Sequence, residues 1–90
     1  MQYVIVFTGN AINGGAAMKY NRIRDLREDA DMKQREVAKA LNCSQQVYSN
    51  YELGQRDIPT DILIALAELY KTNADYILGL TKNKTYYKDL

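Results

Sequence analysis

The sequence contains no histidine, no tryptophan and only one cysteine, Cys43. A single cysteine cannot form an intramolecular disulfide, and without histidine the chain lacks the ligands of most zinc sites. The absence of histidine also excludes catalytic sites in which histidine activates a serine or cysteine nucleophile. We therefore expect no metal, no cofactor and no catalytic residue. We interpret Cys43 as a small buried apolar residue, because free cysteine is among the most buried residue types.

An excess of charge of one sign is also lacking, because 12 Lys and Arg residues stand against 11 Asp and Glu, a formal net charge of +1. A domain that holds nucleic acid through bulk charge is usually much more basic. The balance still permits a specific DNA binder whose few cations lie on one face. No membrane span or signal peptide is recognisable, because the apolar run at residues 3–7 is short and no Lys or Arg precedes it. We expect a cytoplasmic protein.

The stretch at residues 34–54, QREVAKALNCSQQVYSNYELG, predicts two short helices joined by a tight turn. Asn42 suits the turn because asparagine tolerates a left-handed backbone, and Ser44 can cap the second helix by accepting a backbone N–H. This is a helix-turn-helix layout, in which the second helix is presented to a DNA groove. Gln45 and Gln46 would then meet base edges. The alternative is that both are merely solvated polar residues early in a helix.

Residues 1–17 are expected to form a non-helical extension, in which a β-prone segment at 3–8 precedes an uncharged linker. We favour the interpretation that Met18 is the native start and that the earlier residues are an upstream leader. Codons for Gly14 and Gly15 can spell a purine-rich ribosome-binding sequence just before it. The alternative is strand exchange between two copies through residues 3–8.

Helical periodicity begins near Met18 and predicts five helices. We expect them at residues 20–29, 33–41, 45–53, in a segment capped by Thr60, and at 74–78. Ala30 is expected on the apolar face of the first helix. Lys33 is unfavourable at the start of the second, because a lysine cannot accept the capping N–H and a cation opposes the helix dipole. The polar tail at 82–90 is expected to be frayed or lightly docked.

Residues 18–81 resemble the Xre/Cro/C1 family of small phage and bacterial repressors. The matching blocks are RDLR at 24–27, QREVA at 34–38, SQQVYSNYELG at 44–54, Pro59 and NADYILG at 73–79. The resemblance implies an all-α fold, a five-helix lambda-repressor-like DNA-binding domain. It also implies a homodimer that places its third helix in the major groove of double-stranded operator DNA. Dimerisation would involve the region around Leu78 and Leu80.

The resemblance assigns base contacts to Gln45, Gln46 and Asn50. Their amides carry a donor beside an acceptor and so match N6 and N7 of adenine. Val47 is the next candidate, through contact with a thymine methyl group. The residues expected to contact phosphate are Lys33, Gln34, Gln55 and Arg56. For Arg35 and Lys39, which lie on the outer side of the second helix, a solvated face is an equally good interpretation.

Arg27 and Glu52 are implied to form a structural ion pair between the first and third helices. Two residues depart from the family pattern. Asp31 stands where glycine is common, and Tyr48 stands where isoleucine or valine is usual. The larger ring of Tyr48 must be accommodated by the fourth helix or leave its hydroxyl at the surface.

These features predict a sequence-specific DNA-binding transcriptional regulator, most simply a repressor that occupies an inverted-repeat operator as a dimer. The alternative is an antitoxin or protein-interaction module with the same fold, whose unidentified partner would bind the tail at 82–90 or the segment at 3–8. An enzyme is least favoured. Asp29 and Asp31 are paired carboxylates, but solvated turn residues at a helix end are their ordinary explanation.

Overall fold

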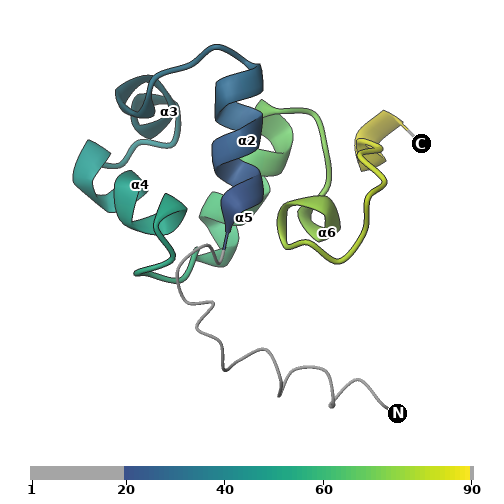
Figure 1. The fold of residues 1–90 in the computed structure, drawn as a ribbon. Helices are drawn as coiled ribbons and strands as arrows, with labels where there is room; N and C mark the ends of the chain where they lie inside the picture. Colours follow the sequence, from purple (N-terminus) through teal and green to yellow (C-terminus); the bar gives the residue numbers. More distant parts are fainter. Residues whose placement is uncertain (1–19, 90) are drawn as a thin grey trace, which may run out of the picture.

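The computed structural model describes residues 20–89, so the expected leader or exchanged strand at 1–17 lies outside the described residues. These residues contain five α-helices, a short 3₁₀-helix and no strand, which confirms the expected all-α fold. The elements are α2 (Asn21–Asp29), α3 (Gln34–Ala40), α4 (Gln45–Glu52), α5 (Thr60–Leu69), α6 (Ala74–Ile77) and the 3₁₀-helix η2 (Tyr87–Asp89). Figure 1 shows α2 between the α3–α4 pair on one side and α6 on the other. No helix in this part of the chain is long and apolar enough to cross a membrane.

All five helices contribute apolar side chains to one core. Its buried members are Ile23, Val37, Ala38, Leu41, Tyr48, Tyr51, Leu66, Ala67 and Ile77. The longest of these helices has only 10 residues. Helices this short are marginal in isolation, so burial of the shared core must supply their stability. Each fully buried Ile, Leu or Val contributes about 1.5–3 kcal/mol relative to an exposed one. The expectation for Ala30 is wrong: it follows the end of α2 and is exposed.

Tyr48 lies at the centre of this core with none of its surface exposed. Its ring packs edge-to-face on Tyr51, with centroids 6.5 Å apart and planes at 84°. Such a pair contributes about 0.5–1.5 kcal/mol beyond its buried area. The domain therefore accommodates the larger ring completely, and the hydroxyl does not reach the surface.

Local chemistry sets most of the turns between the helices. Asn42 and Asp31 both have left-handed backbones, at φ 62° and 61°. Asparagine and aspartate visit this region more readily than other non-glycine residues, so Asp31 can replace the glycine common in the family. Ser44 caps α4 by accepting from the N–H of Val47 over 3.1 Å. The expected cap at Thr60 is wrong, because the extended Pro59 occupies the N-cap position and Thr60 is the first helical residue.

The segment that follows α6 is docked onto the domain by buried polar side chains. The amide nitrogen of Asn73 donates to the carbonyl oxygens of Asn83 and Thr85, over 2.9 and 2.7 Å. The hydroxyl of Thr72 donates to the carbonyl of Lys84 over 3.1 Å. Both Asn73 and Thr72 are buried, so these bonds satisfy polar groups that would otherwise be costly to desolvate. Of the two expectations for the tail, docking is therefore correct for the segment at 81–85.

We predict that Asn73→Ala lowers the free energy of unfolding by about 2–4 kcal/mol. The side-chain oxygen of Asn73 also caps α6 by accepting from the N–H of Tyr76 over 2.8 Å, so the variant loses the cap and both tail contacts. Urea denaturation measures the change, with Asn21→Ala at an exposed position as the control. Amide hydrogen exchange at residues 81–86 should also accelerate. A loss under about 0.5 kcal/mol with unchanged exchange would contradict this role for Asn73.

Candidate nucleic-acid interface

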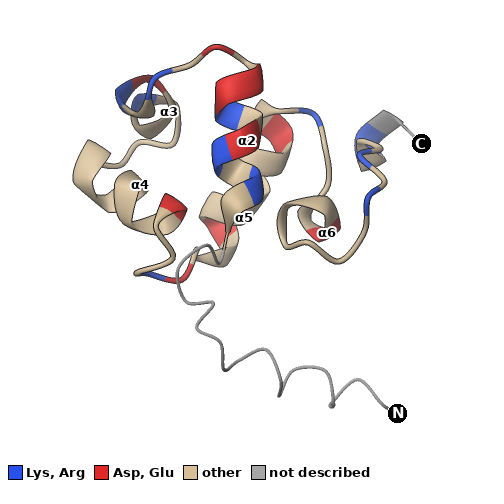
Figure 2. Cartoon of the chain, in the orientation of Figure 1, with Lys and Arg blue, Asp and Glu red and all other residues tan. Residues whose placement is uncertain are grey.

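The outward side of α4 presents amides and no charge. Tyr48 and Tyr51 point into the core and so fix the rotation of the helix about its axis. Gln45 and Gln46 are consequently exposed, and Asn50 is half-buried. The only charged residue of α4 is Glu52, at its last position (Figure 2). A surface of this kind can offer hydrogen bonds to a polar partner without being held to it by bulk charge.

Two of the expected base-contact residues bond to each other. The amide nitrogen of Gln46 donates to the side-chain oxygen of Asn50 over 3.2 Å, one turn further along α4. Val47 is half-buried and packs against the core, so only part of its side chain is available to a ligand. The three amides and Val47 thus occupy neighbouring positions on one short helix.

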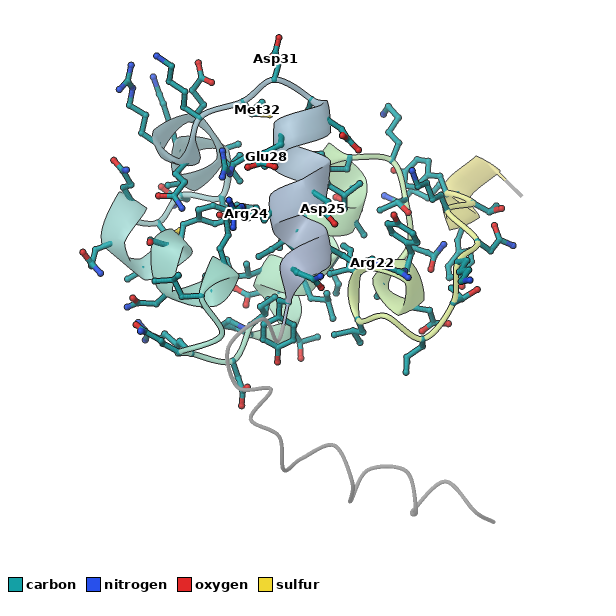
Figure 3. The ribbon with its side chains drawn as sticks, in the orientation of Figure 1. Arg22, Arg24, Asp25, Glu28, Asp31 and Met32 are labelled. Atoms are coloured by element: carbon teal, nitrogen blue, oxygen red, sulfur yellow. The ribbon has the colours of Figure 1, made fainter. Side chains whose placement is uncertain are left out.

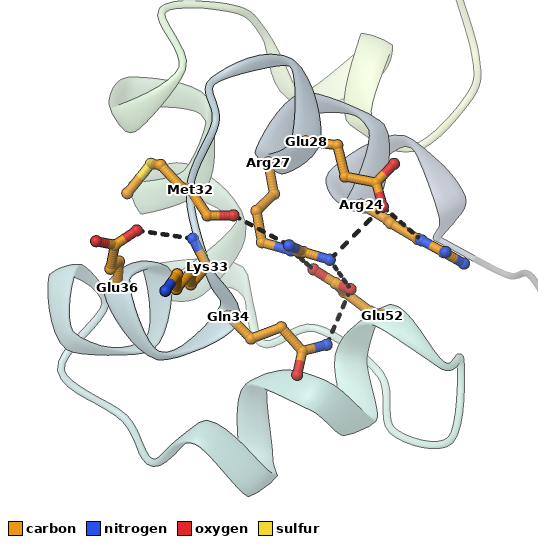
Figure 4. A network of polar contacts seen from close by, with 8 residues as sticks. All are labelled: Arg24, Arg27, Glu28, Met32, Lys33, Gln34, Glu36 and Glu52. Carbon is orange, nitrogen blue, oxygen red and sulfur yellow. Dashed lines mark hydrogen bonds and ion pairs between the residues drawn. The ribbon is translucent and has the colours of Figure 1, made fainter.

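The carboxylate of Glu52 connects three helices beneath this surface (Figure 4). It accepts from Nε and Nη2 of Arg27 on α2, over 2.6 and 3.2 Å, in a two-pronged ion pair. It also accepts from the amide nitrogen of Gln34 on α3 over 3.1 Å. The side chains of Glu52 and Arg27 are only 4% and 14% exposed. The third nitrogen of Arg27, Nη1, donates to the carbonyl of Met32 over 3.0 Å, which extends the network to the α2–α3 connection.

Backbone N–H groups at the start of α3 find their hydrogen-bond acceptors within its first turn. The backbone N–H of Lys33 donates to the carboxylate of Glu36 over 2.7 Å (Figure 4). The N–H of Glu36 donates to the backbone carbonyl of Lys33 over 2.9 Å, and the side chain of Lys33 is exposed. Gln34, the first residue of α3, has one amide N–H engaged by Glu52. Its second N–H and its oxygen remain for another partner, because a side-chain amide has two donor hydrogens and one acceptor oxygen.

The pKa values in this network follow from the same contacts. Burial alone would raise the pKa of Glu52, but the hydrogen bonds from Arg27 and Gln34, together with the nearby Tyr48 hydroxyl, outweigh it and hold the pKa below its ordinary value. The Tyr48 hydroxyl makes no hydrogen bond of regular geometry, yet it lies close enough to Glu52 to favour the carboxylate. Burial first, and then the adjacent carboxylate, raise the pKa of Tyr48. Burial and the same charge raise the pKa of Tyr70 to about 12.

Cations lie beside both ends of α4. At its start, Arg35 and Lys39 of α3 help to line a shallow groove of about 460 Å³ that also contains Ser44 and Gln45. Cys43 lies half-buried in the same groove, so our interpretation of it as a small buried apolar residue is only partly correct. Burial raises the pKa of its thiol.

Gln55 and Arg56 are exposed just beyond the other end of α4. The helix between the two ends has 8 residues. At a rise of 1.5 Å per residue it is about 12 Å long. Of the expected phosphate contacts, Gln34 bonds to Glu52 and so lies, like Gln55 and Arg56, towards the end of α4, whereas the groove with Arg35 and Lys39 lies at its start.

Sequence reasoning missed how the arginines of α2 divide their roles. Figure 3 shows Arg24 on the side of α2 that faces α3 and α4, and Arg22 on the side of α6. Arg22 donates to the carbonyl oxygens of Tyr76 and Thr81 over 2.8 and 2.6 Å, and its guanidinium lies 4.2 Å from the centre of the Tyr76 ring. The alternation of charged residues along α2 carries no signal that distinguishes these partners.

A family model described as helix-turn-helix matches residues 23–77. The chain belongs to this helix-turn-helix family. The match covers α2 to α6, and it confirms the resemblance to the Xre/Cro/C1 type and to a DNA-binding, non-enzymatic domain.

Three curated proteins of Bacillus subtilis (strain 168) are similar to the chain. The HTH-type transcriptional regulator ImmR is 41% identical over 58 residues, 64% of this chain and 46% of ImmR. The uncharacterized HTH-type transcriptional regulator YobD is 36% identical over 64 residues, 71% of this chain and 57% of YobD. The HTH-type transcriptional regulator AnsR is 31% identical over 67 residues, 74% of this chain and 58% of AnsR. The chain thus spans about half the length of these relatives, and no solved structure gave a significant match.

We predict that Arg27→Ala and Glu52→Ala each lower the free energy of unfolding by about 3–5 kcal/mol at neutral pH, because either change leaves a largely buried charge without its partner. Urea denaturation measures both. Arg24→Ala is the matched control, since Arg24 pairs with Glu28 at the exposed surface. Losses of a few tenths of a kcal/mol for Arg27→Ala and Glu52→Ala would mean that the pair contributes little.

The low pKa of Glu52 predicts a specific acid sensitivity. The unfolded carboxyl titrates near 4.5, and the folded one below it. As the pH falls from about 4.5 through the folded pKa, the unfolded state binds the proton more readily, so stability is lost. The stability difference between the wild type and Glu52→Gln should therefore shrink over this window, measured by urea denaturation at successive pH values. Asp29→Asn, at an exposed position, is the control. A difference that stays constant down to pH 2 would contradict the assignment.

Proposed function

We propose that this protein is a sequence-specific transcriptional regulator, most simply a repressor, that binds an inverted-repeat operator as a homodimer. The observation that carries the proposal is the uncharged amide surface of α4, held at a fixed rotation by Tyr48 and Tyr51 and by the bonds of Glu52. Inserted into the major groove, Gln45, Gln46 and Asn50 would contact base edges, as carboxamides do at adenine.

Phosphate contacts would fix the position of α4 in the groove. The start of α3, where Gln34 bonds to the last residue of α4, would offer the second N–H of Gln34 and the exposed ammonium of Lys33 to the DNA backbone. Gln55 and Arg56, just beyond the end of α4, would add further phosphate contacts. Val47 would add contact with a thymine methyl through the part of its side chain that the core leaves open.

Two copies would be needed for useful affinity. Of the residues proposed to contact phosphate only Lys33 and Arg56 carry a charge, so a single domain releases few counterions. Exposed apolar side chains near α6 are candidates for the dimer contact: Leu78 is 41% and Leu80 is 73% exposed. Each dimer would then present two copies of α4 to successive turns of the major groove, about 34–36 Å apart.

The alternative, a protein-interaction module or antitoxin, has one observation in its favour. The docked tail brings cations beside aromatic rings, with the ammonium of Lys84 5.4 Å from the ring centre of Tyr76 and that of Lys71 5.4 Å from the ring centre of Tyr86. This surface is not part of α4 and would remain accessible to a protein partner while α4 binds DNA.

Selection from random double-stranded DNA tests the proposal. We expect enrichment of an inverted repeat with half-sites about one helical turn apart. Gln45→Ala should cost about 1–3 kcal/mol of discrimination at one base pair. Affinity should fall steeply with salt, and Arg56→Ala should reduce that slope by about 2 for the dimer, because each subunit loses one phosphate contact worth about 1.

Lys82→Ala is the matched control for the salt dependence, since it removes an exposed cation from the segment after α6, which lies across α2 from α4 (Figure 1), and should leave the slope unchanged. Equal affinity for unrelated sequences would contradict sequence-specific regulation and favour the interaction module. Enrichment of single, unrepeated sites would retain base recognition but contradict the dimer.

A further inference from the structure

The hydrogen bond between Gln46 and Asn50 makes the two side chains chemically unequal. A carboxamide has one acceptor oxygen and two N–H donors. The bond uses one N–H of Gln46 and part of the accepting capacity of the Asn50 oxygen. Gln46 keeps its own oxygen and a second N–H. Asn50 keeps both N–H groups, but its oxygen is already engaged.

These remaining groups match different bases. Adenine requires an acceptor for its N6 amino group and a donor for its N7 atom, which is the pair that Gln46 retains. Guanine presents only acceptors in the major groove, at N7 and O6. The two free N–H groups of Asn50 fit guanine better than adenine, because adenine would have to share the Asn50 oxygen that already accepts from Gln46.

We propose that Gln46 and Asn50 read DNA as one hydrogen-bonded unit, in which Asn50 orients Gln46 on an adenine and itself donates to a guanine. The proposal rests on the proposed function, since it specifies how α4 selects its site. Asn50 has two roles: it contacts a base, and it is a positioning residue for Gln46. Holding the Gln46 amide before binding reduces the side-chain freedom that must be lost in the complex.

Gln45 provides an internal comparison on the same helix. It is the other exposed glutamine of α4, and it forms no side-chain hydrogen bond to any residue that the structure describes. Its base contact should therefore be independent of Asn50. The hydrogen-bonded pair Gln46 and Asn50 can therefore be compared with the unbonded pair Gln45 and Asn50. Only the bonded pair should show coupled base recognition.

The first test is selection from random DNA with the wild type, Asn50→Ala, Asn50→Asp and Gln45→Ala. Asn50→Ala should relax base preference at two positions, the guanine of Asn50 and the adenine of Gln46. Asn50→Asp retains an acceptor for Gln46 but no N–H, so it should lose the guanine preference and restore the adenine preference. Gln45→Ala should relax one position only. A purely structural role for Asn50 would not produce this pattern of base preferences. Thermal denaturation of each variant checks that the variants remain folded.

The second test is a pair of double-mutant cycles on the selected site. For Gln46→Ala with Asn50→Ala, the double variant should bind more tightly than the product of the two single losses requires, by at least about twofold. For Gln45→Ala with Asn50→Ala, the losses should multiply. In the free protein, Asn50→Ala should also shift the side-chain amide resonance of Gln46 and leave that of Gln45 in place.

The outcomes distinguish this proposal from the proposed function. Suppose that the wild type enriches an operator, that the affinity losses multiply in both cycles, and that Asn50→Ala relaxes base preference at one position only. Coupled reading is then overturned, and the proposed function as a transcriptional regulator stands. Preference for adenine at the Asn50 position would likewise overturn it. If the wild type enriches no sequence, the proposed function fails and coupled reading fails with it.

Discussion

The carboxylate of Glu52 is the contact on which the geometry of this domain depends. It accepts from Arg27 of α2 and from Gln34 of α3 while standing at the last position of α4. These bonds leave the charge with partners in a site where an unpaired carboxylate would be costly. They also determine how the start of α3 and the outward side of α4 lie relative to each other. The two surfaces proposed to contact phosphates and bases are therefore tied to one buried group.

Local signals in the sequence predicted most of the fold. Asn42 adopts the left-handed backbone of the turn, and Ser44 caps a helix that begins at the next residue. Because both effects are local, turn and capping chemistry was enough to find the boundary between α3 and α4. The docked tail could not be found in this way. Asn73 bonds to carbonyl groups at residues 83 and 85, and a pairing of one side chain with a distant irregular backbone produces no periodicity.

In the candidate site, too, local features were predictable from the sequence and long-range contacts were not. The exposure of Gln45 and Gln46 follows from helical spacing once Tyr48 is assigned to the core. The partners Arg27 and Glu52 are 25 residues apart, and the family resemblance, not their spacing, implied the pair. The contact of Gln34 with Glu52 and the bond from Gln46 to Asn50 were not predicted. Each depends on the rotamers of flexible side chains, which composition and pattern do not specify.

The central claim is that DNA binds across α4 and the start of α3. It is tested most directly by titrating the ¹⁵N-labelled protein with its selected DNA duplex and following backbone and side-chain amide resonances. We expect the largest changes at Gln45, Gln46 and Asn50, with a second group at Lys33 and Gln34, and little change at residues 82–88. Changes concentrated in the tail, with the amides of α4 unaffected, would contradict the claim.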